Sequence, residues 1–307
     1  MSLIDLSVAL GGLTLDSPVI AASGVWPMDP ALWPRESVPG LGAICTKGIT
    51  LEPRSGNAGF RLWETPCGLL NSIGLQNRGI EFFVQEELPL LAEAGLPLMA
   101  NLAPESLPEI DRMFQYLEPV AGSLAAVELN LSCPNVDKGG MAWGKTPSGV
   151  ASATARARQA WPGFLMIKLT PQAEDIGATA LAARDNGADG LVAANTWLGM
   201  AMDLEQRRPV FDRITAGLSG PAIHPLTLRL VWEVAGAVEI PVLAGGGVTS
   251  WEDAAAMILA GAAAVEVGTG LMIDLGLADR IVRGLEDYLS AQGLSSVGEL
   301  CGLGREY

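Results

Sequence analysis

The stretch PVLAGGGVTSWEDAAAMILAGAAAVEVGTG, residues 241–270, decides the fold. It contains two short apolar runs that each end in glycines, PVLAGGG at 241–247 and AAVEVGTG at 263–270. The segment between them has helical spacing, and the pair Thr249-Ser250 supplies an N-cap for that helix. A buried strand, a helix and a second buried strand make up the repeating unit of a parallel sheet that is covered by helices.

The same unit recurs along the whole chain. Helix-like segments such as residues 80–94 and 175–186 separate other apolar runs, and they end at Gly95 and Gly187, as helices commonly do. Eight such units favour closure over an open sheet, and no GxGxxG follows the first run, so we predict an α/β fold of the (β/α)8 TIM-barrel type. The eight runs are residues 18–22, 42–48, 97–103, 125–133, 164–170, 190–196, 241–247 and 263–270.

We expect one domain that spans residues 1–307, because barrels of this type commonly reach about 250 residues or more as one core. Inserted loops are expected at about residues 51–77, 134–145 and 200–220. These loops follow the carboxyl ends of predicted strands, which is where barrel enzymes build their active sites.

The composition excludes several classes of protein. With 49% hydrophobic and 17% charged residues the chain is globular, and its net charge of −15 argues against a nucleic-acid partner. No apolar run reaches the roughly 18 residues that a membrane helix needs, and the N-terminus lacks a cationic signal region. The four cysteines show no metal-ligand spacing, which fits a reducing cytoplasm.

Polar residues end most of the predicted strands. In a barrel these ends converge on one mouth, and a buried lysine or amide without partners costs several kcal/mol. So many polar residues at equivalent strand ends indicate that the group has a functional role rather than a purely structural one. The residues are Ser23, Lys47, Asn101, Asn130, Cys133, Lys168, Asn195 and Thr196.

The glycines at 245–247 and 268–270 follow the seventh and eighth runs, where this fold places a phosphate site. A metal is not expected, since the chain has one histidine, His224, and no metal-ligand grouping at the strand ends. A phosphate-bearing ligand without metal suggests an organic cofactor. Reduced flavin is anionic at its N1–C2=O edge, and a lysine there would stabilise it.

Cys133 stands apart from the other cysteines. It ends the fourth run and precedes Pro134 and a glycine-rich stretch with the character of a lid. Because His224 is the only histidine available to activate a thiol nucleophile, proton abstraction is the better role for Cys133. Inert apolar side chains are expected for the remaining three cysteines, Cys45, Cys67 and Cys301.

The motifs resemble those of the class 1 dihydroorotate dehydrogenases, and the resemblance spans the chain in order. The combination is specific, although each motif alone is modest evidence. The motifs are Lys47-Gly48, NSIGLQN (71–77), ELNLSCPNV (128–136), IKLTP (167–171), AANT (193–196), GLSGPAI (217–223), GGGV (245–248) and EVGTG (266–270).

The resemblance implies a flavin mononucleotide (FMN) enzyme that oxidises dihydroorotate to orotate in de novo pyrimidine (UMP) biosynthesis. Cys133 would take the C5 proton while a hydride passes from C6 to FMN. Substrate would be held by Lys47, Asn71, Ser72, Ile73, Gly74, Leu75, Asn130, Asn195 and Thr196. FMN would be held by Ser23, Lys47, Gly48, Asn101, Asn130, Lys168, Gly220, Gly246, Gly247, Gly268 and Thr269.

Within class 1, the stretches 64–77 and 133–144 look like the NAD-linked subclass 1B. In 1B the barrel subunit forms a homodimer inside a heterotetramer, with a partner subunit that carries FAD and a [2Fe–2S] cluster. Membrane-linked class 2 enzymes use serine as the base, whereas this position is cysteine here. His224, Gln172 and Trp197 depart from the expected pattern, and Trp197 is expected to reshape the pocket roof.

Three alternatives remain open at this point. A related flavin barrel of the dihydropyrimidine dehydrogenase type would act on uracil or thymine, which lack the carboxylate. A fumarate-linked class 1A enzyme would need no iron–sulfur partner. A non-catalytic flavin-binding subunit would keep the barrel for assembly alone.

Overall fold

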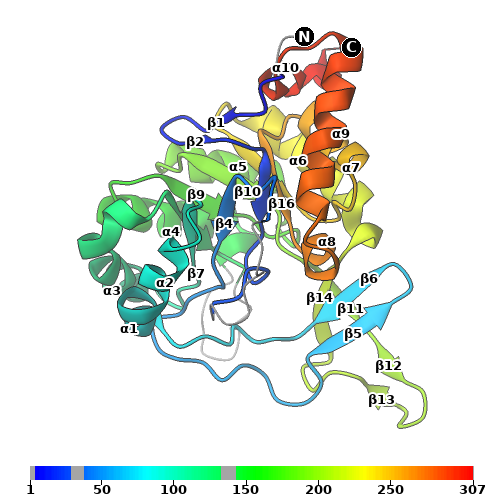
Figure 1. Ribbon diagram of the computed structural model, residues 1–307. Helices are drawn as coiled ribbons and strands as arrows, with labels where there is room; N and C mark the ends of the chain where they lie inside the picture. Colours follow the sequence, from blue (N-terminus) through cyan, green and yellow to red (C-terminus); the bar gives the residue numbers. More distant parts are fainter. Residues whose placement is uncertain (1–3, 29–37, 133–142, 307) are drawn as a thin grey trace.

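The computed structural model describes residues 4–28, 38–132 and 143–306. Eight parallel strands lie at its centre: β3 (Val19–Ala21), β4 (Ala43–Cys45), β7 (Leu98–Leu102), β8 (Ala126–Asn130), β9 (Leu165–Lys168), β10 (Gly190–Ala193), β15 (Val242–Gly245) and β16 (Ala264–Val267). They form a closed barrel in the order β10-β15-β16-β3-β4-β7-β8-β9 (Figure 1). Each strand falls within one of the eight predicted runs, so the prediction of a (β/α)8 TIM barrel is confirmed.

Helices surround the barrel. Ser250 caps the helix at 251–259 by accepting a hydrogen bond from the Asp253 N–H, as the sequence predicts. Gly95 and Gly187 adopt positive φ angles of 68° and 98° where the sequence places helix ends. The helical segments are α1 (Ile80–Phe82), η2 (Phe83–Glu87), α2 (Leu88–Ala92), α3 (Leu107–Leu117), η3 (Glu118–Ser123), η5 (Trp143–Lys145), α4 (Pro147–Ala160), α5 (Ile176–Asp185), η6 (Pro221–Ile223), α6 (His224–Ala237), α7 (Trp251–Leu259), α8 (Thr269–Ile273), α9 (Leu277–Gln292), α10 (Val297–Leu300) and η7 (Leu303–Arg305).

The helix predicted over residues 80–94 differs in one respect, because its middle segment η2 is a π-helix. Pro89 explains where the regular helix is interrupted. It has no N–H to donate to the carbonyl of Gln85, and its ring would crowd that carbonyl in a regular α-helix. A wider π turn relieves this conflict and lets α2 continue in the same direction.

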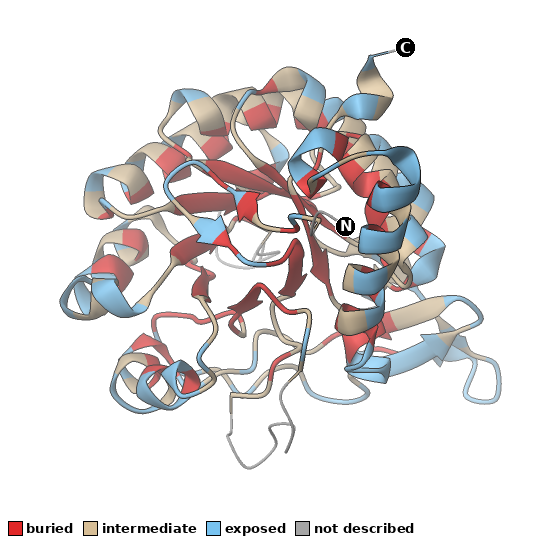
Figure 2. Cartoon of the chain, turned by 45° about the horizontal axis from the view of Figure 1, so that its top comes forward, coloured by how far each residue is buried: buried red, intermediate tan, exposed pale blue. Residues whose placement is uncertain are grey.

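The barrel strands are buried along their length. Every residue of β3, β9, β10, β15 and β16 is buried, and Figure 2 shows the strands as the continuous buried centre of the molecule. Such strands carry few polar residues because both faces of a parallel barrel sheet are covered. Each fully buried Val, Leu or Ile side chain contributes about 1.5–3 kcal/mol relative to an exposed one.

The inserts at 51–77 and 200–220 contain strands that the sequence analysis did not predict. Together with β11 (Trp197–Met200) they form a four-stranded antiparallel sheet in the order β11-β14-β6-β5, in which Asn71 pairs with Gly217. This sheet lies beside one end of the barrel (Figure 1). Its other strands are β5 (Leu62–Thr65), β6 (Gly68–Asn71) and β14 (Thr215–Ser219), and β12 (Met202–Asp203) and β13 (Arg208–Pro209) form a separate hairpin.

Of the third predicted insert, 134–145, residues 134–142 lie outside the described part of the chain, and the remainder belongs to η5. At the other end of the molecule, the first described residues of the chain lie against the segment that follows α9. The Asp5 N–H donates to the Ser295 carbonyl at 2.9 Å, and the Val297 N–H donates to the Asp5 carbonyl at 2.9 Å. Next to this contact, β1 (Val8–Ala9) and β2 (Thr14–Leu15) form an antiparallel hairpin.

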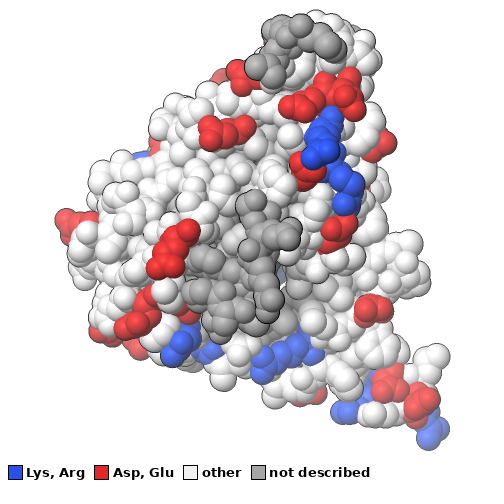
Figure 3. Space-filling model, in the orientation of Figure 1, with Lys and Arg blue, Asp and Glu red and all other residues white. Residues whose placement is uncertain are grey.

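None of the helices in the described ranges combines the length and apolar character required to cross a bilayer. Acidic side chains are spread over the face shown in Figure 3, and the basic ones there gather near α9 and along the lower edge. In α9, Arg283 pairs with Asp279 at 2.9 Å. That face therefore presents no continuous basic surface among the described residues.

Candidate active site

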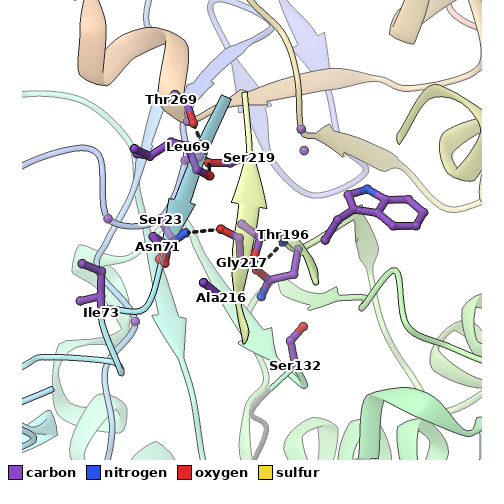
Figure 4. A pocket seen from close by; sticks show the side chains of 18 of the residues that line it. Ser23, Leu69, Asn71, Ile73, Ser132, Thr196, Ala216, Gly217, Ser219 and Thr269 are labelled. Atoms are coloured by element: carbon purple, nitrogen blue, oxygen red, sulfur yellow. Dashed lines mark hydrogen bonds between the residues drawn. The ribbon is translucent and has the colours of Figure 1, made fainter. Parts of the chain in front are cut away.

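A pocket of about 830 Å³ lies at the mouth formed by the carboxyl ends of the barrel strands. The four-stranded sheet β11-β14-β6-β5, called the second sheet below, forms part of the pocket wall. Leu69 and Asn71 of β6 and Ala216 and Gly217 of β14 line the pocket (Figure 4). Pockets for small molecules and cofactors span roughly 300 to 1,000 Å³, so this one has room for a nucleotide-sized cofactor and a small ring together.

Most of the site residues predicted from the sequence meet in this pocket. Of the other two, Cys133 lies outside the described residues, and Asn101 is fully buried and does not line the pocket. Ser132, directly before Cys133, lines the pocket, so the chain leaves the described region at its rim. The predicted residues that line the pocket are Ser23, Lys47, Gly48, Asn71, Ser72, Ile73, Gly74, Leu75, Asn130, Lys168, Asn195, Thr196, Gly220, Gly246, Gly247, Gly268 and Thr269.

The glycines after β15 form a tight cradle at one side of the pocket. Gly246 and Gly247 have φ angles of 139° and 82°, which side chains disfavour. A Cβ on Gly247 would lie 2.5 Å from backbone atoms of His224, and one on Gly246 would lie 2.8 Å from Thr227 Oγ1. Only glycine therefore lets this loop pack so closely against the start of α6 while it lines the pocket, which fits a phosphate held by main-chain N–H groups.

Two hydroxyl groups complete this side of the pocket. Thr269, which begins α8 after β16, donates from Oγ1 to Ser219 Oγ of β14 at 2.9 Å (Figure 4). Ser219 in turn donates to the Leu69 carbonyl at 3.3 Å. The second sheet is thereby tied to the end of the eighth barrel strand at the place where the phosphate is expected.

An array of amides also lines the pocket. Asn195 donates from Nδ2 to Asn130 Oδ1 at 3.3 Å and accepts from the Thr196 N–H at 2.7 Å. Asn71 donates from Nδ2 to the Gly217 carbonyl at 3.2 Å (Figure 4). These contacts fix the amide orientations and leave further donors and acceptors for a ring that offers both.

The loop 72–75 is held in an unusual backbone conformation. Gly74 and Leu75 have φ angles of 75° and 53°. Asn57 donates from Nδ2 to Ser72 Oγ at 3.0 Å, and Asn77 donates to the Leu75 carbonyl at 2.7 Å. A non-glycine residue with positive φ needs such support, so the loop is built to present its backbone to the pocket.

The two pocket lysines have different surroundings. The Lys168 ammonium lies 3.0 Å from Glu128 Oε1 and 2.6 Å from Glu266 Oε2. The Lys47 ammonium has no hydrogen-bond or ion-pair partner within residues 4–28, 38–132 and 143–306, and burial lowers its pKa. A half-buried cation that faces a pocket without a counter-ion is suited to receive an anionic group from a ligand.

Sequence reasoning missed the carboxylates of Glu128 and Glu266. Together with the Cys45 sulfur, an oxygen of each lies within a cluster whose atoms are no more than 4.8 Å apart. This is a potential metal-ligand set, but the Lys168 ammonium already supplies its positive charge. Both glutamates interrupt buried apolar runs in the sequence, and that interruption was the signal that could have revealed them.

Comparison with known proteins bears directly on this site. The family model for dihydroorotate dehydrogenase matches residues 5–289. The chain belongs to the dihydroorotate dehydrogenase family. The family is flavin-dependent, and the resemblance predicted from the motifs is confirmed.

Several relatives in this family carry the name dihydroorotate dehydrogenase B (NAD(+)), catalytic subunit. The protein of Thermoanaerobacter sp. (strain X514) is 40% identical over 299 residues, which cover 97% of this chain and 98% of that protein. The Geotalea daltonii protein is 43% identical over 298 residues, covering 97% of each chain. The Porphyromonas gingivalis protein is 42% identical over 304 residues, covering 98% of each. The predicted likeness to the NAD-linked subclass is therefore confirmed.

The three departures from the expected family pattern all lie near the pocket. Trp197 lines it and donates from Nε1 to Thr227 Oγ1 at 3.5 Å. Gln172 also lines it and accepts from Thr170 Oγ1 at 2.6 Å. His224 begins α6 directly against Gly247, so it is placed by the packing of the cradle.

Proposed function

We propose that this chain oxidises dihydroorotate to orotate in pyrimidine biosynthesis, as the catalytic subunit of an NAD-linked dihydroorotate dehydrogenase. The observation that carries the proposal is that the Lys47 ammonium, which has no partner among the described residues, lines the same pocket as the amide array. Dihydroorotate combines a carboxylate with a ring of alternating donors and acceptors. The family and the names of the relatives support the same conclusion.

The flavin that fits this site is FMN. Gly246 and Gly247 of the cradle, together with Gly268 and Thr269 after β16, line the pocket and would hold its phosphate. The remaining predicted positions, Ser23, Gly48, Asn130, Lys168 and Gly220, line the same pocket, whereas Asn101 would act from behind the wall. Bound FMN would supply the hydride acceptor for the substrate C6 hydrogen.

The residues of the chain would hold and deprotonate the substrate. Lys47 would pair with the carboxylate, and the loop 71–75 would offer its backbone to the same group. Asn130, Asn195 and Thr196 would hold the ring amides in one orientation. Cys133 would take the C5 proton, and its place in the chain, next to pocket-lining Ser132, supports this role.

Replacing Lys47 with methionine is expected to weaken orotate binding by about tenfold or more, because the ligand carboxylate loses its charged partner. Binding of uracil, which has no carboxylate, is expected to stay unchanged. Burial lowers the pKa of Lys47, so the ammonium loses its proton at a lower pH than an ordinary lysine, whose pKa is about 10.4. Orotate affinity in the wild type should therefore begin to fall at a pH below that value.

Orotate and uracil titrations, followed by the perturbation of the flavin spectrum, measure both effects. Equal losses of orotate and uracil affinity in Lys47→Met would mean that Lys47 shapes the pocket rather than recognising the carboxylate.

A separate subunit is proposed to pass the electrons to NAD. We propose that it carries FAD and a [2Fe–2S] cluster, and that a homodimer of this chain lies inside a heterotetramer. The words "catalytic subunit" in the relatives' names support a partner. We expect NAD reduction by dihydroorotate only when such a partner is added; NAD reduction by the isolated chain would contradict this. A cytoplasmic location stays a prediction.

A further inference from the structure

Five polar side chains are buried together inside the barrel, at and below the floor of the pocket. Lys168 of β9 and Glu266 of β16 line the pocket, and Glu128, Asn101 and Cys45 lie behind them with no exposed surface. The strands β9 and β16 are separated in the barrel by β10 and β15, so the contact between Lys168 and Glu266 crosses the interior.

Glu128 is the hydrogen-bond centre of this cluster. Its Oε1 accepts from Asn101 Nδ2, from Lys168 Nζ at 3.0 Å and from Cys45 Sγ at 3.4 Å. Although burial raises the pKa of Glu128, the Lys168 charge and these donors lower it below the usual value. Glu128 is therefore the ionised carboxylate that balances Lys168.

If Lys168 and Glu128 balance each other, an ionised Glu266 would add a second negative charge with no positive charge to balance it. The cluster has one ammonium and two carboxyl groups, and the Cys45 thiol stays protonated because burial and the Glu128 charge raise its pKa. If both carboxyls were ionised, a net negative charge would be buried under the pocket, which costs several kcal/mol. Burial, followed by the Glu128 charge, raises the pKa of Glu266 well above its usual value.

Three oxygen atoms of the cluster accept no hydrogen bond from the described residues: Asn101 Oδ1 and one oxygen of each carboxyl group. Glu128 Oε2 and Glu266 Oε1 are buried without a partner among the described residues, if every carboxyl oxygen is treated as an acceptor. An oxygen of each carboxyl lies within 4.8 Å of one of the other, so a proton held between the two carboxyls would let one donate to the other.

We propose that Glu266 is a positioning residue that shares a proton with Glu128 and fixes the Lys168 ammonium at the pocket floor, so that the cluster carries no net charge. This inference rests on the proposed function only in placing FMN above that floor. The flavin site then has Lys168 as an oriented donor whose charge is already balanced, whereas the described residues supply no counter-ion to Lys47.

The groups that face Glu266 are few. Lys168 contacts it from β9, Glu128 from β8, and Cys45 from β4. Its strand neighbours in β15 and β3, Gly245 and Ile20, carry no titratable group. Deprotonation of Glu266 at high pH is therefore governed by these three side chains and by whatever ligand lies above the floor.

The test uses the protein without FMN, together with the variants Glu266→Gln and Glu128→Gln. Each variant keeps one carboxylate for Lys168 and replaces the acid–carboxylate pair by an amide–carboxylate pair of the same shape. We expect an infrared carbonyl band of a buried protonated carboxylic acid in the wild type, and its loss in both variants. Persistence of the band in Glu266→Gln, or its absence from the wild type, would overturn the proposal.

Stability against pH gives a second readout. A raised pKa in the folded state means that the folded protein binds more protons than the unfolded chain above about pH 4.5, the ordinary glutamate value. The free energy of unfolding of the wild type should therefore fall relative to Glu266→Gln as pH rises, until Glu266 ionises in the folded protein. A constant difference across this range would contradict the shared proton, and Glu128→Gln provides the same comparison if Glu266→Gln does not fold.

The FMN-loaded protein tests the link to the cofactor. We expect wild type and Glu266→Gln to have the same FMN midpoint potential at low pH, where both clusters are neutral. As pH rises, the wild-type potential should become the more negative, because ionised Glu266 adds an anion beneath the flavin. A difference that does not vary with pH would assign Glu266 a merely structural role. The infrared and stability results stand without FMN or substrate, so their failure is distinct from failure of the proposed function.

Discussion

Replacing Cys133 with alanine is expected to slow the reduction of bound FMN by dihydroorotate by at least roughly 10²-fold, the scale of losing a general base. FMN should remain bound, because the cradle and the barrel mouth are untouched. A thiol has an ordinary pKa near 8.5, so its deprotonation at neutral pH needs nearby positive charge. Lys47 would supply such a charge, because it lines the same pocket as Ser132, the residue before Cys133.

The measurement is anaerobic stopped-flow absorbance of the flavin after mixing with dihydroorotate. Cys301→Ala is the matched control, because Cys301 is a free cysteine at the C-terminal end of the chain and does not line the pocket. We expect that control to behave as the wild type. An unchanged rate in Cys133→Ala would remove Cys133 from the mechanism.

Gly247→Ala is expected to weaken FMN binding by about 10²-fold. A side chain at φ 82° adds strain of about 1–2 kcal/mol, and the new Cβ would lie 2.5 Å from the His224 backbone. Relief of that contact must move the glycine backbone or the start of α6. The displaced N–H groups would then lose charge-assisted hydrogen bonds to the phosphate, each of which contributes about 1.5–3 kcal/mol.

Gly95→Ala separates the loss of cofactor contact from backbone strain. Gly95 has a comparable φ of 68°, but a Cβ there would meet nothing within 4 Å. Both variants should lower the free energy of unfolding of the protein without FMN. Only Gly247→Ala should lose FMN affinity in fluorescence titrations, and an equal loss in Gly95→Ala would show that general strain, not the cradle, governs FMN binding.

The barrel could be predicted from the sequence because each strand is a short apolar run bounded by glycine or proline. The convergence of Asn130, Asn195 and Lys168 followed from the same pattern, since parallel strands bring their carboxyl ends to one mouth. Capping at Ser250 is a local interaction and was predictable for that reason.

Features that depend on contacts between distant segments were not predictable in this way. The pairing of Asn71 with Gly217 joins two inserts, and the sequence predicts each of them as a loop. The different surroundings of Lys47 and Lys168 depend on Glu128 and Glu266, which reach Lys168 from other strands. A one-dimensional pattern locates such charged residues but does not show which of them meet inside the barrel.

An anaerobic titration of the FMN-loaded protein with dihydroorotate and, separately, with dihydrouracil tests the central claim most directly. The two compounds share the reduced pyrimidine ring, and only dihydroorotate has the carboxylate that Lys47 is expected to bind. We predict that dihydroorotate bleaches the flavin absorbance and that dihydrouracil does not. Bleaching by dihydrouracil without bleaching by dihydroorotate would contradict the account.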